Sequence, residues 1–349
     1  MNSYIVKNEN ALFYECGFSC DNALFLRFGA DEAYFLTDGR YITEAKENIK
    51  NAEIIDAKRD LIKKARDIIK KARLKNILFD PLEFSVAGFG ALSKNLSVNF
   101  IAKKNFSQIK RAVKTPKEIE LIETAALLGQ QGFERFAAFL REHGVGKSER
   151  ELHYEAQNFM RHNGKNKLSF SPICAINENA AKPHAAPSEN AALKNGDLLL
   201  LDAGVKYRRY CSDRTRMIET NEYAAFDDKK TQKFKDAFRQ KIYDTVLKAQ
   251  EAAIKAVKIG IKASDIDKAA RSVIEKAGFG KYFIHSTGHG VGLDIHELPV
   301  ISSKSCAILE EGMVFTIEPG IYLPNKFGVR IEDMAAIVNG KVKILHENG

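Results

Sequence analysis

A run of four leucines that ends on an acid sets the strongest limit on the fold of this chain. Residues 198–201 are all leucine, which is typical of a strand buried on both faces, and Asp202 closes the run. A second acid, Asp213, follows within the next turn and strand. Burying a carboxylate is costly unless something pairs with it. The chain must therefore bring a partner for these two acids into its interior.

Length and cysteine content narrow the class of protein. The chain has 349 residues, more than one hydrophobic core comfortably serves, so two domains are expected. Its five cysteines have irregular spacing and no CxxC, which argues against a disulfide framework and favours a cytoplasmic location. The N-terminus has no basic stretch followed by an apolar one, and no apolar run is long enough to span a bilayer. We therefore expect neither a signal peptide nor a membrane partner.

The net charge of +9 comes largely from lysine-rich stretches such as residues 62–75. The lysines there lie at helical spacing opposite isoleucine and alanine, which indicates a solvated helix face. No nucleic-acid-binding motif accompanies the charge, so a nucleic-acid partner is not expected.

The pattern of expected secondary structure changes near residues 109–118. Before this point, short strands and helices alternate, as in the hairpin expected at 23–38. Thr115, Pro116 and Glu118 then form a capping-box pattern that starts a helix. Later helices are separated by strand pairs, which is typical of an α+β fold with a mostly antiparallel sheet. The expected helices of this second part are 116–142, 149–164, 229–258 and 264–278. The expected domains are 1–112 and 113–349.

Two pairs of segments place acids on the same face of a strand. Residues 210–218 would return beside 198–202, and alternation then points Asp213 into the same space as Asp202. Near the C-terminus, residues 312–322 and 328–337 would present Glu318 and Glu332 in the same way.

A metal centre would explain why four carboxylates gather among apolar residues. Without a cation they would repel one another and lose hydration. His289 lies between two glycines, where the backbone can pass close to an ion. Four carboxylates and one imidazole suit a pair of divalent ions, which favours Mn²⁺, with Co²⁺, Fe²⁺ or Zn²⁺ as alternatives. Each residue alone also has an ordinary structural interpretation, as a turn acid or a core histidine, so the joint pattern carries this prediction.

The motifs DAG (202–204), GHGVGLDIHE (288–297), FTIEPGIY (315–322) and GVRIED (328–333) together resemble the metallopeptidase family of methionine aminopeptidase, aminopeptidase P and prolidase, known as M24. The likeness covers residues 113–349 and implies an α+β pita-bread catalytic domain. TDGRY (37–41) resembles the smaller α/β creatinase-like N-terminal domain of the aminopeptidase P and prolidase branch. The resemblance therefore points to peptides with proline in the second position.

The resemblance also implies site residues. The metal ligands would be Asp202, Asp213, His289, Glu318 and Glu332. Asp213 and Glu332 would bridge two ions, and Glu318 would also carry a proton to the leaving nitrogen. His184, in PHAAP (183–187), would lie beside the substrate with His285 and His296, while Arg330 would partner an acidic ligand. His143, His153, His162 and His346 are expected at the surface.

The activity implied is removal of the first residue of an Xaa-Pro peptide by a hydroxide that bridges the two metals. The alternative is a prolidase, which cleaves only Xaa-Pro dipeptides, and a homodimer is expected for either enzyme. Some relatives bind peptides without catalysis, and creatinase-like relatives work without metal. Both kinds lack ligand residues that this chain has.

Two departures from the family pattern affect details. Arg209 stands in a turn where relatives often have glycine, and we expect the turn to differ slightly. Glu178 and Asn179 replace glycine near the expected mouth of the site, which bears on substrate preference rather than on the metal ligands.

Overall fold

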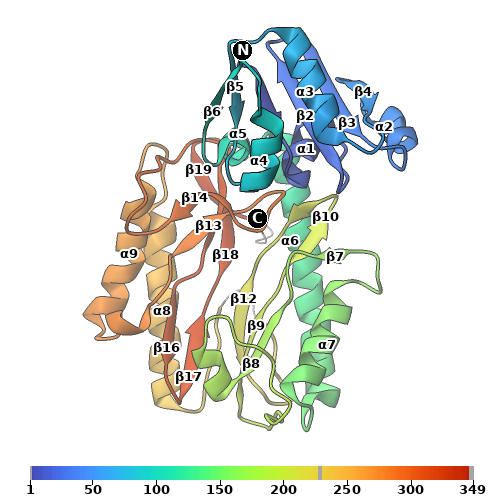
Figure 1. Ribbon diagram of the computed structural model, residues 1–349. Helices are drawn as coiled ribbons and strands as arrows, with labels where there is room; N and C mark the ends of the chain where they lie inside the picture. Colours follow the sequence, from blue (N-terminus) through green and yellow to red (C-terminus); the bar gives the residue numbers. More distant parts are fainter. Residues whose placement is uncertain (1, 227–229, 346–349) are drawn as a thin grey trace. The chain divides into compact units, whose positions relative to one another are not determined.

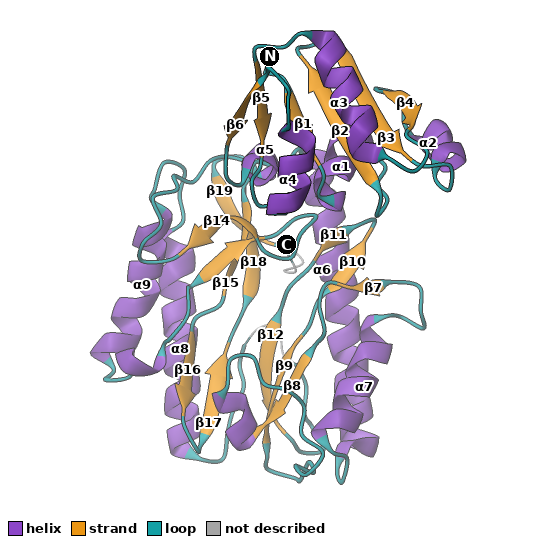
Figure 2. Ribbon diagram, viewed as in Figure 1, coloured by secondary structure: helices purple, strands orange, loops and turns teal. Residues whose placement is uncertain are grey.

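The computed structural model describes residues 2–226 and 230–345. The chain divides into two compact units, Met1–Arg111 and Ala112–Gly349 (Figures 1 and 2). All five cysteines are free. Within the described ranges, no helix is both long and apolar enough to cross a membrane.

The first unit is built on a six-stranded mixed sheet with the order β4-β3-β2-β1-β5-β6. The predicted hairpin forms from β2 and β3, which pair antiparallel from Ala23 opposite Thr37. The strands are β1 (Tyr4–Val6), β2 (Ala23–Phe28), β3 (Glu32–Thr37), β4 (Glu53–Asp56), β5 (Asn76–Phe79) and β6 (Asn99–Ala102). The helices are α1 (Glu9–Cys16), α2 (Ile42–Asn48), α3 (Leu61–Ala72), α4 (Val86–Ser93) and α5 (Phe106–Arg111).

Both faces of this sheet are buried, which explains the nearly continuous apolar sequence of β2. Phe25 belongs to a cluster that includes Leu12 of α1, whereas Leu24 belongs to a second cluster that includes Ile69 of α3. The lysines of α3 are exposed on the opposite side of that helix. The prediction that this lysine-rich stretch is a solvated helix face is therefore confirmed.

Local capping signals set the helix starts of the second unit. The side chain of Glu118 accepts a hydrogen bond from the backbone N–H of Thr115 at 2.8 Å, which completes the predicted capping box at the start of α6. The second capping box, at Ser148 before α7, also forms. Helix α8 begins later than predicted because Asp236 caps it, and residue 229 of that prediction lies outside the described residues. The helices are α6 (Pro116–Phe139), which continues into a π-helical turn at Leu140–Gly144, α7 (Glu149–Met160), α8 (Ala237–Ala256) and α9 (Ala263–Lys276), with short 3₁₀ turns at Asn177–Ala181 and Gly280–Tyr282.

All strand pairs described in the second unit are antiparallel. They form sheets with the orders β12-β9-β8, β14-β13-β15-β18-β19, β16-β17 and β11-β10-β7. The early strands are β7 (Lys167–Leu168), β8 (Ile173–Ile176), β9 (Leu198–Asp202), β10 (Val205–Tyr207), β11 (Tyr210–Cys211) and β12 (Thr215–Glu219). The later strands are β13 (Gly288–Gly290), β14 (Glu297–Ile301), β15 (Val314–Ile317), β16 (Gly320–Leu323), β17 (Phe327–Arg330), β18 (Asp333–Val338) and β19 (Lys341–Ile344).

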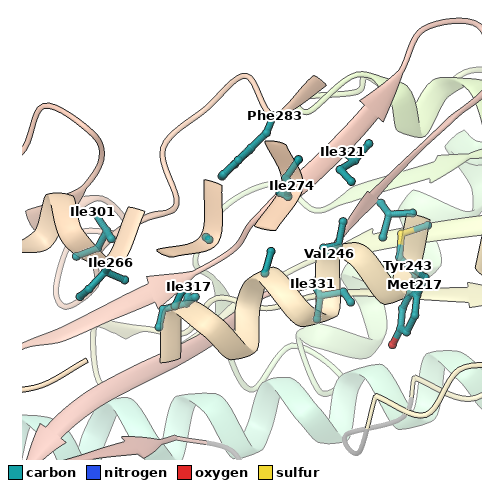
Figure 3. Packing of buried hydrophobic residues seen from close by; sticks show 14 of the residues in the cluster. Met217, Tyr243, Val246, Ile266, Ile274, Phe283, Ile301, Ile317, Ile321 and Ile331 are labelled. Atoms are coloured by element: carbon teal, nitrogen blue, oxygen red, sulfur yellow. The ribbon is translucent and has the colours of Figure 1, made fainter. Parts of the chain in front are cut away.

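The leucine run in β9 serves two cores at once. Leu198 and Leu200 belong to the cluster that includes α8 and α9, whereas Leu199 and Leu201 belong to the cluster that includes α6 and α7. Figures 1 and 2 show these helix pairs on opposite sides of the strands, and Figure 3 shows part of the first cluster. The strand is therefore apolar on both faces, as the sequence predicts, and the α+β class is confirmed.

The predicted return strands are interrupted at the acids. Asp213 lies in a gap between β11 and β12, Glu318 between β15 and β16, and Glu332 between β17 and β18. The strands were expected to be continuous, and that expectation is wrong. The register does not change across the last two gaps, since Ile317 pairs with Asp333 and Gly320 with Arg330. The hairpin therefore loses ladder hydrogen bonds at the acids without slipping.

Candidate metal centre

The end of β9 and the start of β12 hold the first two acids. Asp202 pairs with Thr215 in the antiparallel register, and Asp213 lies two residues before Thr215. Both carboxylates are buried, at 8% and 5% exposure. The leucine run thus delivers Asp202 to the interior, and the hairpin brings Asp213 to the same side.

The C-terminal hairpin holds the two glutamates. Its unchanged register places Glu318 opposite Glu332 across the gap in the ladder. Like charges directly opposite each other destabilise a strand pair unless a cation lies between them. Glu332 is buried and accepts a hydrogen bond from the Thr215 hydroxyl at 2.6 Å, which links the two hairpins. The Thr316 hydroxyl donates to Glu318 Oε1 at 3.3 Å.

His289 is aimed at the acids by its neighbours in β13. A Cβ at Gly288 would lie 1.9 Å from the Thr316 carbonyl oxygen, and one at Gly290 would lie 2.2 Å from that of Leu298. Only glycine allows this close approach of the backbones. The Nδ1 atom of His289 lies 3.1 Å from the Gly290 carbonyl, so Nδ1 carries the proton and Nε2 keeps its lone pair. That Nε2 lies 3.6 Å from Asp213 Oδ2 and 3.5 Å from Glu318 Oε1.

The ligand atoms of Asp213, His289 and Glu332 lie within 4.8 Å of one another. Glu318 joins this group through His289. The remaining acid, Asp202, has one buried oxygen, Oδ1, that meets no hydrogen-bond donor among the residues that the structure describes. The structure therefore brings these side chains, all proposed as ligands from the sequence, into one part of the second unit.

Burial and mutual repulsion disfavour the charged forms of these acids. Burial, followed by repulsion from Glu332 and Asp202, raises the pKa of Asp213 well above its ordinary value. Burial, followed by repulsion from Glu318 and Asp202, raises the pKa of Glu332 in the same way. Burial also raises the pKa of Glu318 to about 8 and lowers that of His289 to about 4.

The group suits divalent cations on chemical grounds. A cation placed among the carboxylates would oppose both the repulsion and the loss of hydration that raise their pKa values. His289 is neutral at physiological pH, as a metal ligand must be. The unpaired Oδ1 of Asp202 also requires a partner.

Arg330 connects the two acid pairs through a buried hydrogen-bond network. Its Nη2 donates to Asp202 Oδ2 at 2.6 Å and its Nε donates to the Thr215 hydroxyl at 3.0 Å. Its Nη1 donates to the Tyr322 hydroxyl at 2.8 Å and lies 3.3 Å from the Pro183 carbonyl. A planar guanidinium can hold several acceptors at fixed angles, which a lysine cannot do.

His285 and His296, two of the three histidines predicted to lie beside the substrate, make different contacts. Both ring nitrogens of His285 are engaged, Nδ1 with the Ser286 carbonyl at 2.7 Å and Nε2 with the Tyr322 hydroxyl at 2.8 Å. Burial lowers the pKa of His285 to about 4, so the ring is neutral. His296 stacks edge-on with His289 at 4.3 Å between ring centroids.

His184 lies on an exposed loop next to Pro183, whose carbonyl contacts Arg330. Of the histidines expected at the surface, His162 is instead buried and hydrogen-bonds the Leu128 carbonyl at 2.8 Å, so that prediction is wrong for this residue. His346 lies outside the described residues.

In the β10–β11 turn Arg209 does have positive φ, at 76°, so it adopts the conformation that glycine favours.

Thr215 and Tyr322 were not among the site residues predicted from the sequence. Thr215 shares a strand face with Asp213, which was a usable signal. Tyr322 follows Glu318 by four residues in a separate strand, and nothing in the sequence indicates that its hydroxyl meets Arg330 and His285. Burial raises the pKa of this hydroxyl to about 12, so it remains protonated and can donate to His285.

The chain was compared with known families, sequences and structures. Residues 120–339 match metallopeptidase family M24, and residues 1–114 match the creatinase/prolidase N-terminal domain. A Xaa-Pro dipeptidase of Pyrococcus furiosus is 39% identical over 265 residues, which cover 73% of this chain and 72% of the relative. The solved structure of a Xaa-Pro dipeptidase from Bacillus anthracis superposes with a TM-score of 0.89 at 31% identity, covering 100% of this chain and 93% of that one. An X-Pro aminopeptidase structure from Thermotoga maritima superposes with a TM-score of 0.86 at 29% identity, covering 100% and 96%.

The pita-bread fold and its carboxylate-rich centre define a metal-dependent peptidase preceded by a creatinase-type N-terminal domain. The chain belongs to metallopeptidase family M24. The family resemblance seen in the sequence motifs is thus confirmed.

Proposed function

We propose that this chain is a Xaa-Pro dipeptidase, which hydrolyses the bond between the first residue and proline in a dipeptide. The observation that carries the proposal is the convergence of Asp213, His289 and Glu332, with Glu318 beside them, in a domain of this family. The names of the relatives favour the dipeptidase, which the sequence analysis gave as the alternative, over the aminopeptidase that it put first.

Five side chains would hold two divalent ions, and Mn²⁺ is the metal that the ligand chemistry supports best. The proposed ligands are Asp202, Asp213, His289, Glu318 and Glu332. When bound, the ions would activate water and polarise the scissile carbonyl. Arg330 would hold Asp202 in place through its hydrogen bond, and Thr215 would do the same for Glu332.

The remaining residues would handle protons and the substrate carbonyl. The proline nitrogen has no N–H of its own and must gain a proton as it leaves. Glu318 would take a proton from the attacking water and pass it to that nitrogen. His184 and His296 would donate hydrogen bonds to the carbonyl oxygen as it gains charge. His285, whose ring is fixed by Tyr322, would form part of the wall around the proline.

We also propose that residues 1–112 and 113–349 form the N-terminal and catalytic domains, which the two compact units support. A homodimer and a cytoplasmic location remain predictions from the sequence.

The proposed function is tested with purified protein that is stripped with EDTA and reloaded with Mn²⁺. We expect rapid release of alanine from Ala-Pro, little release from Ala-Pro-Ala, and no activity before reloading. Preference for the tripeptide would instead support the aminopeptidase, to which the Thermotoga maritima structure is similar. Absence of cleavage of either peptide would refute both.

The metal assignment is tested by Asp213→Ala, with Asp265→Ala as a control at an exposed acid of α9. Loss of a residue that supports a metal ligand lowers activity by up to roughly 100-fold. Removing the ligand itself should lower kcat/KM for Ala-Pro by more than this factor. The control should behave as the wild type. Full activity in Asp213→Ala would contradict a metal centre at this position.

A further inference from the structure

A buried polar network lies behind the proposed ligands, on the side of α8. Gln250 is fully buried on the face of α8 that carries Tyr243, Val246 and Ala253 into the apolar core. Figure 3 shows the neighbouring Val246 among the isoleucines of this core, with Ile317 and Ile331 nearby. A glutamine in such a position must satisfy its amide or lose free energy.

The amide nitrogen of Gln250 contacts the main chain immediately before each glutamate ligand. Its Nε2 lies 3.1 Å from the carbonyl oxygen of Ile317 and 3.2 Å from that of Ile331. Glu318 and Glu332 are the next residues along the chain. These are also the points at which the strand ladder is interrupted. The side chain of Gln250 therefore supplies donors at the gap where the two strands do not pair with each other.

The same nitrogen extends the contact to Asp333, whose Oδ2 lies 3.0 Å away. Arg216 approaches Asp333 from β12, with Nη2 at 2.5 Å from Oδ1, and Lys230 pairs with Oδ2. Arg216 Nη1 also donates to the carbonyl oxygen of Glu332 at 2.6 Å. The charge of Asp333 is thus compensated, and the main chain of Glu332 is held from two sides.

The amide oxygen of Gln250 indicates the role of this side chain. Gln250 Oε1 is buried and meets no donor within residues 2–226 and 230–345. An unsatisfied buried oxygen is destabilising, and an apolar residue of similar size would avoid it. Reversing the amide would point the oxygen at three acceptors. The stability gained by the side chain therefore resides in its two N–H groups and the carbonyls they hold.

We infer that Gln250 is a positioning residue for the metal centre: its amide fixes the separation of the Glu318 and Glu332 backbones and thereby sets the affinity for divalent ions. This inference rests on the metal site of the proposed function. Gln250 acts through the ligands, because its amide contacts the carbonyl oxygens of Ile317 and Ile331, the residues before Glu318 and Glu332, rather than the carboxylates of these glutamates.

The test compares Gln250→Met, which keeps the size and removes the donors, with Val246→Ala, which weakens the same face of α8 without touching a carbonyl. Mn²⁺ binding to the EDTA-stripped protein is measured by calorimetry, and the coupling between bound ions by electron paramagnetic resonance. We expect Mn²⁺ affinity to fall by roughly 10–100-fold in Gln250→Met, the usual cost of losing a residue that supports a ligand. Val246→Ala should lower the melting temperature and leave Mn²⁺ affinity and the resonance spectrum unchanged.

Gln250→Asn keeps an amide that is one methylene too short to reach both carbonyls, and it should weaken Mn²⁺ binding in the same way. Wild-type affinity in either folded variant would overturn the inference. Failure of both variants to fold would also overturn it, because Gln250 would then be a structural core residue. A wild-type protein that binds Mn²⁺ but cleaves no Xaa-Pro peptide would refute the proposed function alone.

Discussion

Thr215 connects two acids of the second unit, Asp202 at the end of β9 and Glu332 between β17 and β18. Its hydroxyl donates to Glu332 and accepts from Arg330, which in turn donates to Asp202. One small side chain thus helps to fix the geometry of both acid pairs. Neither contact can be made by valine, which has nearly the same shape.

The first prediction concerns Thr215→Val. We expect Mn²⁺ affinity to fall by roughly 10–100-fold, because Glu332 loses a donor and Arg330 Nε loses its acceptor. The melting temperature of the metal-free protein should also fall, since a buried donor left unsatisfied costs about 1–3 kcal/mol. Thr245→Val is the matched control, because that hydroxyl donates to the Lys241 carbonyl within α8. Equal effects of the two substitutions on Mn²⁺ binding would remove the special role of Thr215.

The second prediction concerns pH and His285. Burial lowers the pKa of this ring from 6.5 to about 4, so the unfolded chain binds more protons than the folded one between these values. Stability from this residue is therefore complete above about pH 6.5 and is lost as the pH falls toward 4. Replacing His285 by glutamine should make the free energy of unfolding fall less between pH 7 and pH 5, as measured by urea denaturation in EDTA. An unchanged slope would show that the ring titrates normally.

At the scale of the elements, caps and interrupted strands decide where side chains go. The Thr115–Glu118 capping box starts α6 after the first unit ends. Because its partners are three residues apart, the signal is local and the start of the helix was predictable. The breaks in the hairpins at Asp213, Glu318 and Glu332 were not, because the alternating pattern continues through them.

The third prediction concerns the capping box at the start of α6. Thr115→Ala should lower the free energy of unfolding by about 1 kcal/mol, because it leaves the backbone N–H of Glu118 without its acceptor. Hydrogen exchange of that amide should become faster. Thr124→Ala, in the middle of the same helix, removes a hydroxyl that donates to the Glu120 carbonyl and should change little. If both variants lose the same stability, the capping box contributes nothing beyond a helical hydroxyl.

At the scale of the whole molecule, the candidate metal centre lies within the second unit. The proposed ligands all come from residues 112–349, whereas the first unit has its own two apolar clusters. Binding of ions should therefore stabilise one unit directly.

The fourth prediction follows from this division. Mn²⁺ at a hundredfold excess over its Kd should stabilise the second unit by about 2.7 kcal/mol for each site. Hydrogen exchange should slow in α8 and β18 on adding Mn²⁺, and the exchange of α3 in the first unit should stay constant. Equal protection of α3 and α8 would mean that the two units unfold together, and protection of neither would contradict binding.

The features that could be predicted from the sequence are those that depend on neighbours in the chain. The leucine run at residues 198–201 predicted a strand buried on both faces, and the spacing of the acids predicted a shared site. Glycines beside His289 predicted a close backbone approach, which the contacts with Thr316 and Leu298 now explain. The family motifs added the N-terminal domain and the expectation of Xaa-Pro peptides.

Which polar groups meet inside that site depends instead on how distant parts of the chain pack together. Tyr322 contacts His285 across 37 positions, Arg330 contacts Asp202 across 128, and Gln250 contacts Ile317 across 67. No local pattern encodes such pairs, because a hydroxyl or amide looks the same in sequence whether it faces water or a buried carbonyl. Folding removes the water, and each buried donor must then find the acceptor that the packing of strands and helices has placed beside it.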